Sequence, residues 1–315
     1  MQLVDFEIQH NTRIAANTYR ILLSPGSSIP PPAPGQFVNI QLEGRYLRRP
    51  ISVCDWDGQT LTLIYKAVGE GTKQLAGYAA GQRLNLLLWL GNGYDYSRQG
   101  TGDRRQDVGS GQGTGDRRQD VRDREGELRD GEQDSPLATS FLPPDSSNIP
   151  CSLSHPTSRI PCLLPPPSSL LIGGGVGVPP LYYLAKELLR AGRRPVAILG
   201  FNRADEVFYL REFAKLCETI VTTADGSLGQ KGFVTHAMES VGNYDALYAC
   251  GPEAMLKAIY DQAAPLPPGR AQFSFERRMG CGFGACMACS CRTLAGSKRI
   301  CVDGPVLARE EIIWE

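Results

Sequence analysis

Five of the ten cysteines in this 315-residue chain fall between residues 281 and 301. Three stand in C-x4-C-x2-C spacing and a fourth follows later, which gives the set Cys281, Cys286, Cys289 and Cys301. Soft thiolates hold iron, and this spacing with a distant fourth ligand is the plant-type 2Fe-2S pattern. The small residues between the cysteines let backbone N–H groups turn toward the sulfurs. We therefore expect this segment to fold around a 2Fe-2S cluster.

A structural zinc site is the alternative for these thiols. Zinc ribbons favour paired C-x2-C knuckles, and only Cys286 and Cys289 form one clean pair here. Cys291 forms C-x-C with Cys289, but in an extended segment its side chain would point the opposite way, so it stays outside the ligand set. Cys54 and Cys217 are expected to be buried, inert thiols.

Length and charge limit the other possibilities. A chain of 315 residues predicts two or three domains. Its 33 basic and 33 acidic residues cancel, so no net field draws it to nucleic acid or to an anionic membrane. The N-terminus lacks a signal-peptide pattern, and no apolar run approaches the roughly 20 residues that span a bilayer. Clustered cysteines without a secretory signal favour metal ligands over disulfides, and we expect a cytoplasmic protein.

Residues 1–96 carry short alternating strands separated by Gly/Pro turns. The strand signals cover 6–14, 19–24, 36–42, 51–58 and 61–68. Many short strands of this kind predict an antiparallel β-barrel or a sandwich.

Residues 97–168 have a different character. The sequence GTGDRRQDV occurs at 100–108 and again at 113–121, followed by mixed charges and proline-rich stretches. Such polar composition buries too little apolar surface to offset the entropy of ordering, so we predict a disordered low-complexity insertion, with an interaction tail as the alternative. Cys151, His155 and Cys162 match no metal-site spacing.

Residues 169–266 alternate short apolar strands with amphipathic helices, which predicts a small doubly wound parallel sheet. Residues 267–315 leave that pattern and hold the cysteine cluster. The sequence thus predicts a multidomain chain: a β-barrel, an α/β domain and a small C-terminal 2Fe-2S domain.

Two glycine turns follow strands of the α/β part. The first contains Gly173, Gly174, Gly175 and Gly177. It suits a dinucleotide pyrophosphate, but position 178 is valine, so G-x-G-x-x-G fails and a plain turn is as good an explanation of this motif alone. The second turn contains Cys250, Gly251, Pro252 and Glu253. Ligands of parallel sheets bind beyond the carboxyl ends of strands, where both turns should lie.

This pair of turns resembles the corresponding turns of the ferredoxin-reductase superfamily. Proteins of that superfamily join a flavin-binding barrel to a nucleotide-binding domain. The barrel carries that family's R-x-x-S pattern in Arg49, Pro50, Ile51 and Ser52. The resemblance implies that Arg49 binds the FAD pyrophosphate and that Ser52 lies near the isoalloxazine. It likewise implies a segment along the flavin, Ile64, Tyr65 and Lys66, and a phosphate-binding turn at a helix start, Gly71 and Thr72. An arginine and a serine on a strand would otherwise be ordinary surface residues.

The whole combination resembles the electron-transfer subunits of type B dihydroorotate dehydrogenases, apart from residues 97–168, which that family lacks. The resemblance implies a partner catalytic subunit with FMN, in a heterotetramer of two of each. The partner oxidises dihydroorotate, and electrons cross the 2Fe-2S cluster and FAD to NAD⁺ in de novo pyrimidine (UMP) biosynthesis. It also implies that this chain has no catalytic residue for dihydroorotate and that residues 250–253 border the nicotinamide.

Other functions stay open at this point. A subunit of another NAD(P)H-ferredoxin-type oxidoreductase would share every motif, and a non-enzymatic redox sensor or scaffold would bind the same groups without turnover. The insertion could also make the chain an inactive copy. NAD and NADP are not distinguished, because Arg203 and Asp205 both follow the second strand of the α/β part. Residues 225–227 either line the nucleotide site or form a simple turn.

Overall fold

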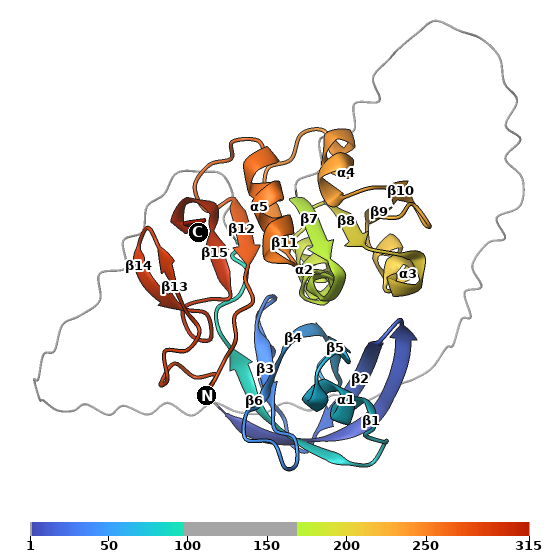
Figure 1. The fold of residues 1–315 in the computed structure, drawn as a ribbon, viewed down its shortest axis with the longest axis vertical. Helices are drawn as coiled ribbons and strands as arrows, with labels where there is room; N and C mark the ends of the chain where they lie inside the picture. The colour runs from blue at the N-terminus through green and yellow to red at the C-terminus, as the bar shows by residue number, and fades with distance from the viewer. Residues whose placement is uncertain (1, 98–168, 315) are drawn as a thin grey trace, which may run out of the picture. The chain divides into compact units, whose positions relative to one another are not determined.

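A computed structural model describes residues 2–97 and 169–314 of the chain (Figure 1). These two ranges belong to one compact unit. Apart from Ser97, the predicted insertion lies outside the described residues, as do Cys151, His155 and Cys162.

The N-terminal part is a closed six-stranded antiparallel barrel with the strand order β1-β2-β5-β4-β3-β6. Along the first strand Val4, Phe6 and Ile8 are buried while their neighbours are exposed, as period-two alternation requires. The predicted barrel is confirmed. Its elements are β1 (Leu3–Ala15), β2 (Thr18–Pro25), β3 (Phe37–Ile40), β4 (Arg49–Trp56), β5 (Leu61–Lys66), α1 (Glu70–Ala76) and β6 (Arg83–Leu90).

The second part is a seven-stranded sheet of order β10-β9-β8-β7-β11-β12-β15, parallel except for β15. Strand order runs outward in both directions from β7, so the sheet reverses its winding between β7 and β11, where such sheets bind ligands. Its strands are β7 (Ser169–Gly174), β8 (Pro195–Phe201), β9 (Glu218–Thr223), β10 (Gln230–Lys231), β11 (Leu247–Cys250), β12 (Ala271–Ser274) and β15 (Val306–Ala308).

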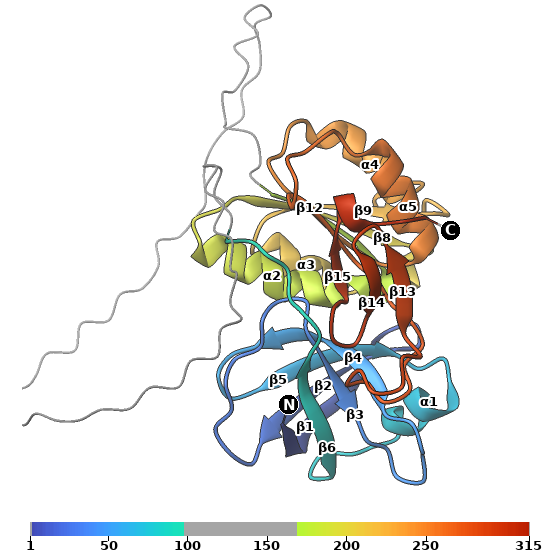
Figure 2. The ribbon, with the colours of Figure 1, turned by 90° about the vertical axis from the view of Figure 1, so that its left-hand side faces the viewer.

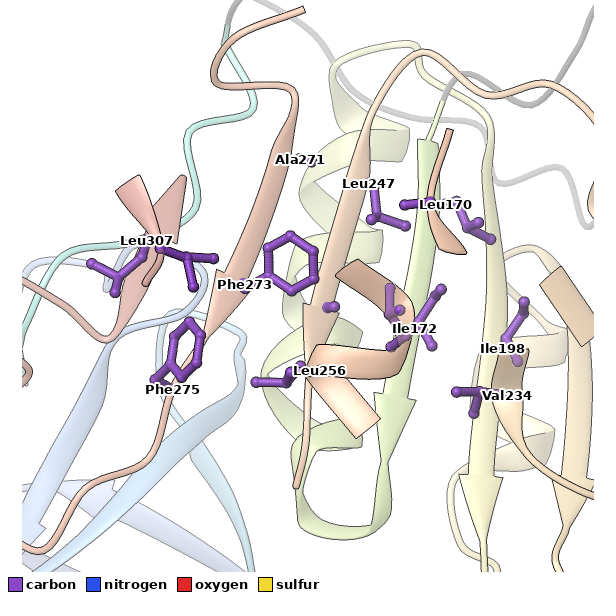
Figure 3. Packing of buried hydrophobic residues seen from close by; sticks show 14 of the residues in the cluster. Leu170, Ile172, Ile198, Val234, Leu247, Leu256, Ala271, Phe273, Phe275 and Leu307 are labelled. Atoms are coloured by element: carbon purple, nitrogen blue, oxygen red, sulfur yellow. The ribbon is translucent and has the colours of Figure 1, made fainter. Parts of the chain in front are cut away.

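Helices cover both faces of this sheet (Figures 1 and 2). On the face toward the barrel, Leu184 of α2 shares a buried cluster with Leu171. On the other face, Val234 of α4 and Leu256 of α5 pack with the strand residues shown in Figure 3. The helical segments are η1 (Gly175–Gly177), α2 (Val178–Arg190), η2 (Ala204–Glu206), α3 (Leu210–Ala214), α4 (Val234–Val241), α5 (Glu253–Gln262) and η3 (Arg309–Glu311).

Two features are not visible in the sequence patterns. The helical part between β8 and β9 is divided into η2 and α3, because Tyr209 adopts a left-handed backbone conformation with φ 60° just before the short α3. The segment after residue 267 remains attached to the nucleotide domain, because β12 and β15 extend that domain's sheet on either side of the cysteine segment. That segment contains the hairpin of β13 (Ser290–Thr293) and β14 (Gly296–Arg299). Within the part of the chain that the structure covers, no helix is long and apolar enough to cross a membrane.

Candidate functional site

Arg49 and Gly71, which the sequence places 22 positions apart, meet in the barrel. A Cβ atom built on Gly71 would overlap Nε of Arg49 and would lie 2.7 Å from its Nη2. A hydrogen bond also fixes the guanidinium, because Nη1 donates to the carbonyl of Leu47 at 2.6 Å. The rest of the R-x-x-S motif continues along β4, where Pro50, Ile51 and Ser52 lie opposite Asn39, Val38 and Phe37. Arg49 and Gly71, the two predicted phosphate-binding groups of the barrel, are therefore in contact and form one candidate site.

Thr72 has a structural role next to Arg49 and Gly71. Its hydroxyl donates to the carbonyl of Gly69 at 3.1 Å and accepts from the amides of Gly69 and Val68 at 3.1 and 3.2 Å. The side chain thus closes the turn that leads into α1. Gly71, which is buried, lets the Arg49 side chain lie directly against the start of that helix.

The predicted flavin-lining segment on β5 turns its side chains toward different neighbours. Ile64 is buried in the cluster that also contains residues of the nucleotide-domain sheet. Tyr65 lies in the barrel core and donates from its hydroxyl to Oδ1 of Asn11 at 2.9 Å. Lys66 forms an ion pair with Glu206 at 3.0 Å. The side chains of Tyr65 and Lys66 therefore already have protein partners.

The two glycine turns of the α/β part also meet. Cys250 lies opposite Gly173 in the register of β11 and β7, so the turns leave neighbouring parallel strands at the same edge. A Cβ atom on Gly177 would overlap the carbonyl of Cys250, and one on Gly174 would lie 3.1 Å from Cδ of Pro252. Only glycine permits this approach of one backbone to the other. The predicted nucleotide turns, Gly173 to Gly177 and Cys250 to Glu253, therefore form one edge of the sheet at its reversal point.

Cys250 is a partly buried thiol. Burial raises its pKa to about 12, against smaller opposing contributions from hydrogen bonds with Ser274 and Tyr94. Tyr94 is itself 4% exposed and donates to the carbonyl of Ala249 at 3.3 Å. Such a thiol is a poor nucleophile, because the thiolate is the reactive form. A positioning role for Cys250 fits these surroundings.

Other candidates of the nucleotide part lie nearby. Glu253 begins α5 and forms a two-pronged ion pair with Arg277, with distances of 3.0 and 3.2 Å. This pair joins the nucleotide edge to the segment that leads into the cysteines. Asp225 accepts from the amide and hydroxyl of Ser227 at 2.9 and 2.6 Å, which is the geometry of a local turn.

The four predicted cluster ligands are gathered in two pairs. The amide of Cys281 donates to the sulfur of Cys286 at 3.3 Å, and the amide of Cys301 donates to the sulfur of Cys289 at 3.4 Å. Cys289 and Cys301 are each 2% exposed, whereas Cys286 is exposed. Among residues 2–97 and 169–314, no three His, Cys, Asp or Glu side chains converge as metal ligands, so the structure brings the thiols together as pairs.

Backbone amides surround the sulfur of Cys281. Phe283, Ala285 and Cys286 donate to it at 3.4, 3.2 and 3.4 Å. The loop can turn in this way because Gly282 and Gly284 have φ values of 78° and 89°, which few other residues adopt.

These donors change the acidity of the thiols. Burial opposes ionisation of Cys281, but the amides of Phe283, Cys286 and Ala285 together lower the pKa of its thiol to about 6. Burial, together with the neighbouring sulfur of Cys289, raises the pKa of Cys301 to about 12. The environment of Cys281, which stabilises negative charge on its sulfur, suits a thiolate-bound iron cluster. Cys291 lies opposite Lys298 in the hairpin and packs against the main core.

Asn39 lies between the R-x-x-S strand and the cysteine loop. It is fully buried, and neither side-chain atom has a hydrogen-bond partner among the described residues. It pairs with Pro50, and a Cβ atom on Gly282 would overlap its Nδ2. A buried amide without partners costs about 1–3 kcal/mol, so this position fits a bound group that supplies a polar atom. The donor chemistry of the barrel and the cysteine loop thus suits a flavin and an iron-sulfur cluster.

Comparison with known proteins gives the chain a family. The electron transfer subunit of dihydroorotate dehydrogenase B (NAD(+)) from Geobacillus sp. (strain WCH70) is 35% identical over 309 residues, which cover 95% of this chain and 94% of that protein. The protein of the same name from Fusobacterium nucleatum subsp. nucleatum is 34% identical over 324 residues, covering 99% of each. This chain belongs to that family of electron transfer subunits.

Further matches agree with the dihydroorotate dehydrogenase B family. Residues 276–313 match the iron-sulfur cluster binding domain of dihydroorotate dehydrogenase B, and residues 171–261 match an oxidoreductase NAD-binding domain. A solved structure of an NADH-dependent reduced ferredoxin-NADP oxidoreductase is 26% identical with a TM-score of 0.68, covering 98% of this chain and 90% of that one. The predicted family and fold class are confirmed.

Two residues of this electron transfer subunit escaped the sequence analysis. Asn39 stands in an ordinary strand alternation, where nothing distinguishes a buried amide from an exposed one. Asn92 donates to the carbonyl of Val306 at 2.8 Å and accepts from its amide at 2.9 Å, which ties the segment after the barrel to the strand after the cysteines. Gly91 and Gly93 on either side of Asn92 are typical of a turn, but the sequence does not indicate the partner of Asn92, which lies 214 positions away.

Proposed function

We propose that the chain is the electron-transfer subunit of an NAD-dependent dihydroorotate dehydrogenase. In this function a partner catalytic subunit with FMN oxidises dihydroorotate, and this chain carries the electrons by a 2Fe-2S cluster and FAD to NAD⁺. The chain is an oxidoreductase subunit in pyrimidine biosynthesis, and we place it in the cytoplasm in a heterotetramer with two copies of each subunit. Full-length kinship to proteins of this name supports the assignment.

One observation carries the proposal beyond kinship: the amides of Phe283, Ala285 and Cys286 all point at the sulfur of Cys281. A bound 2Fe-2S cluster accepts and releases single electrons, and FAD exchanges one or two, which lets the pair feed a hydride acceptor. We assign Cys281, Cys286, Cys289 and Cys301 as the ligands of iron. Amide donors lower the charge density on the sulfurs and hold them in place before metal binds.

The contacts of individual residues also suggest where FAD and NAD bind. Arg49 offers paired N–H donors, and with the backbone of Gly71 it would hold the FAD pyrophosphate, while Ser52 presents its hydroxyl further along the same strand. The joined glycine turns, from Gly173 and from Cys250, would hold NAD at the reversal point of the sheet. The partly buried Cys250 side chain, whose pKa is raised, would shape the nicotinamide end of that site.

The deciding experiment is copurification with the FMN subunit, followed by cofactor analysis. The complex should contain FAD, FMN and two iron atoms for each copy of this chain, show a rhombic EPR signal on reduction, and couple dihydroorotate oxidation to NAD⁺ reduction. A colourless chain with one zinc ion would overturn the proposal.

A variant separates the cluster from the flavin. Cys286→Ser should lose iron and the dihydroorotate-dependent reduction of NAD⁺, yet keep NADH oxidation by an artificial dye, because the dye takes electrons from FAD. Cys217→Ser is the matched control, since this partly buried thiol lies outside the cysteine segment, next to the start of β9. Undiminished electron flow from the partner in Cys286→Ser would remove the cluster from the route.

A second function has one observation in its favour, the likeness to the ferredoxin-NADP oxidoreductase structure. The same copurification distinguishes the two functions, because a subunit of that kind would accompany another catalytic protein and would not respond to dihydroorotate. Titration with NADH and NADPH in the dye assay decides the nucleotide, which we propose to be NAD.

A further inference from the structure

Arg299 bridges two parts of the cysteine segment. Its Nη1 donates to the carbonyl of Gly284 at 3.1 Å, inside the loop that carries Cys281 and Cys286. Its Nε donates to Oδ2 of Asp303 at 3.1 Å, just beyond Cys301. One guanidinium therefore connects the two halves of the ligand set that the backbone keeps apart.

The backbone around Arg299 is also fixed. Its amide donates to Oδ2 of Asp303 at 2.9 Å, and its carbonyl accepts from the amides of Val302 and Asp303 at 3.0 and 2.7 Å. Gly284 fits closely against this turn, because a Cβ atom there would lie 2.7 Å from Cγ2 of Val302 and 3.1 Å from Nη1 of Arg299. Residues 299–303 thus present the Arg299 side chain in one orientation.

The charge of Arg299 is also placed beside the predicted ligands. Its guanidinium bonds the carbonyl of Gly284, between Cys281 and Cys286, and its backbone lies two positions before Cys301. The side chains of Arg299 and Asp303 are 34% and 35% exposed. An ion pair as exposed as Arg299–Asp303 contributes little to folding stability. We therefore look for its role in the geometry of the cysteine segment.

We propose that Arg299, held by Asp303, is a positioning residue of the cluster site that fastens the Cys281–Cys286 loop to the Cys301 turn and raises the reduction potential of the bound cluster. The inference rests on the proposed function, since it presupposes a 2Fe-2S cluster on these cysteines. Reduction adds negative charge to the cluster, and a nearby cation stabilises the reduced form. Loss of that cation therefore makes the potential more negative.

The test uses the full chain with its cofactors and three variants. Arg299→Gln removes the charge, Arg299→Lys keeps it, and Arg292→Gln removes an equal charge from an exposed position on β13 as the matched control. The midpoint potential of the cluster is measured by an EPR-monitored redox titration, with iron content determined on the same samples. We expect Arg299→Gln to lower the equilibrium constant for one-electron reduction about tenfold, which corresponds to about 59 mV.

The controls define the other outcomes. Arg299→Lys should restore most of the potential, and Arg292→Gln should change the reduction constant less than threefold. If Arg299→Gln and Arg292→Gln give the same potential with full iron content, or if Arg299→Lys falls as far as Arg299→Gln, the charge has no such role and the inference is wrong. A wild-type chain without iron would instead overturn the proposed function.

A second measurement does not need the cluster. In the metal-free chain, Asp303→Asn should release Arg299 and speed amide hydrogen exchange in the peptide over residues 280–288 at least threefold. Arg292→Gln should leave that exchange rate unchanged. Equal exchange in Asp303→Asn and wild type would refute the fastening role, even where Arg299→Gln fails to hold iron.

Discussion

The contact between Arg49 and Gly71 predicts how a single methyl group should affect flavin binding. In Gly71→Ala the new Cβ would overlap Nε of Arg49 and would lie 2.8 Å from its Cζ, well inside an ordinary contact of about 3.5 Å or more. The guanidinium must move, because Gly71 is fixed by the start of α1. Arg49 is only partly buried, so it can move without unfolding the barrel.

The size of the effect follows from the bonds that Arg49 would lose. A hydrogen bond to a charged group contributes about 1.5–3 kcal/mol, and about 1.4 kcal/mol is a factor of ten in affinity. Displacing one such bond to the FAD pyrophosphate should therefore weaken FAD binding roughly ten- to a hundredfold. The flavin-free chain should lose at most about 1–3 kcal/mol of stability from the crowding.

Gly69→Ala is the matched control. It lies two positions earlier, has φ −109°, and an added Cβ would meet nothing within 4 Å. FAD affinity is measured by fluorescence during reconstitution of the apoprotein, with the free energy of unfolding measured on the same flavin-free samples. We expect Gly71→Ala to bind FAD far more weakly than Gly69→Ala at similar stability. Equal affinities in the two variants would show that Arg49 and Gly71 do not form the flavin phosphate site.

Three further predictions concern other contacts. Gly177→Ala should collide with the carbonyl of Cys250 and abolish NADH-dependent dye reduction while flavin stays bound; normal turnover at unchanged KM would contradict the joined nucleotide turns. In the metal-free chain, alkylation of Cys281 should rise with pH through about 6, because amide donors stabilise its thiolate; a profile centred near 9, followed by peptide mass spectrometry, would refute this. A double-mutant cycle of Lys186→Met and Asp55→Asn, measured by denaturant unfolding, should give a coupling of roughly 1 kcal/mol, since the pair is 2.6 Å apart and mostly buried; additive effects would assign it no role.

Much of the fold could be predicted because its signals are periodic. Strand alternation in residues 1–96 indicates the barrel, and strand–turn–helix repeats after residue 169 indicate the parallel sheet. The patterns give no information where an element is too short to show a period. Strands β12 and β15 have four and three residues, so nothing in their sequences shows that they join the nucleotide-domain sheet.

The site was predictable to the extent that general rules bring distant residues together. The edge rule for parallel strands places the Gly173 and Cys250 turns side by side, and family order suggests that Arg49 and Gly71 share a ligand. No rule of this kind applies to Arg299. An arginine in a hairpin is normally a solvated surface residue, and its contact with Gly284 depends on how a loop with two left-handed glycines folds back.

The segment that follows the barrel connects all three candidate sites. The carbonyl of Gly91 accepts from Nε2 of Gln36 on the barrel side at 2.9 Å. Asn92 binds Val306 beyond the cysteine turn, and Tyr94 donates to the carbonyl of Ala249, next to Cys250. Electron transfer depends on how far apart its carriers are held, so these few residues matter more than their turn-like sequence suggests. The same segment ends at the start of the predicted insertion, where Asp95 is already bonded to Gln272 of β12. The contacts that align the three candidate sites are thus complete before residue 97, so they do not depend on the predicted insertion.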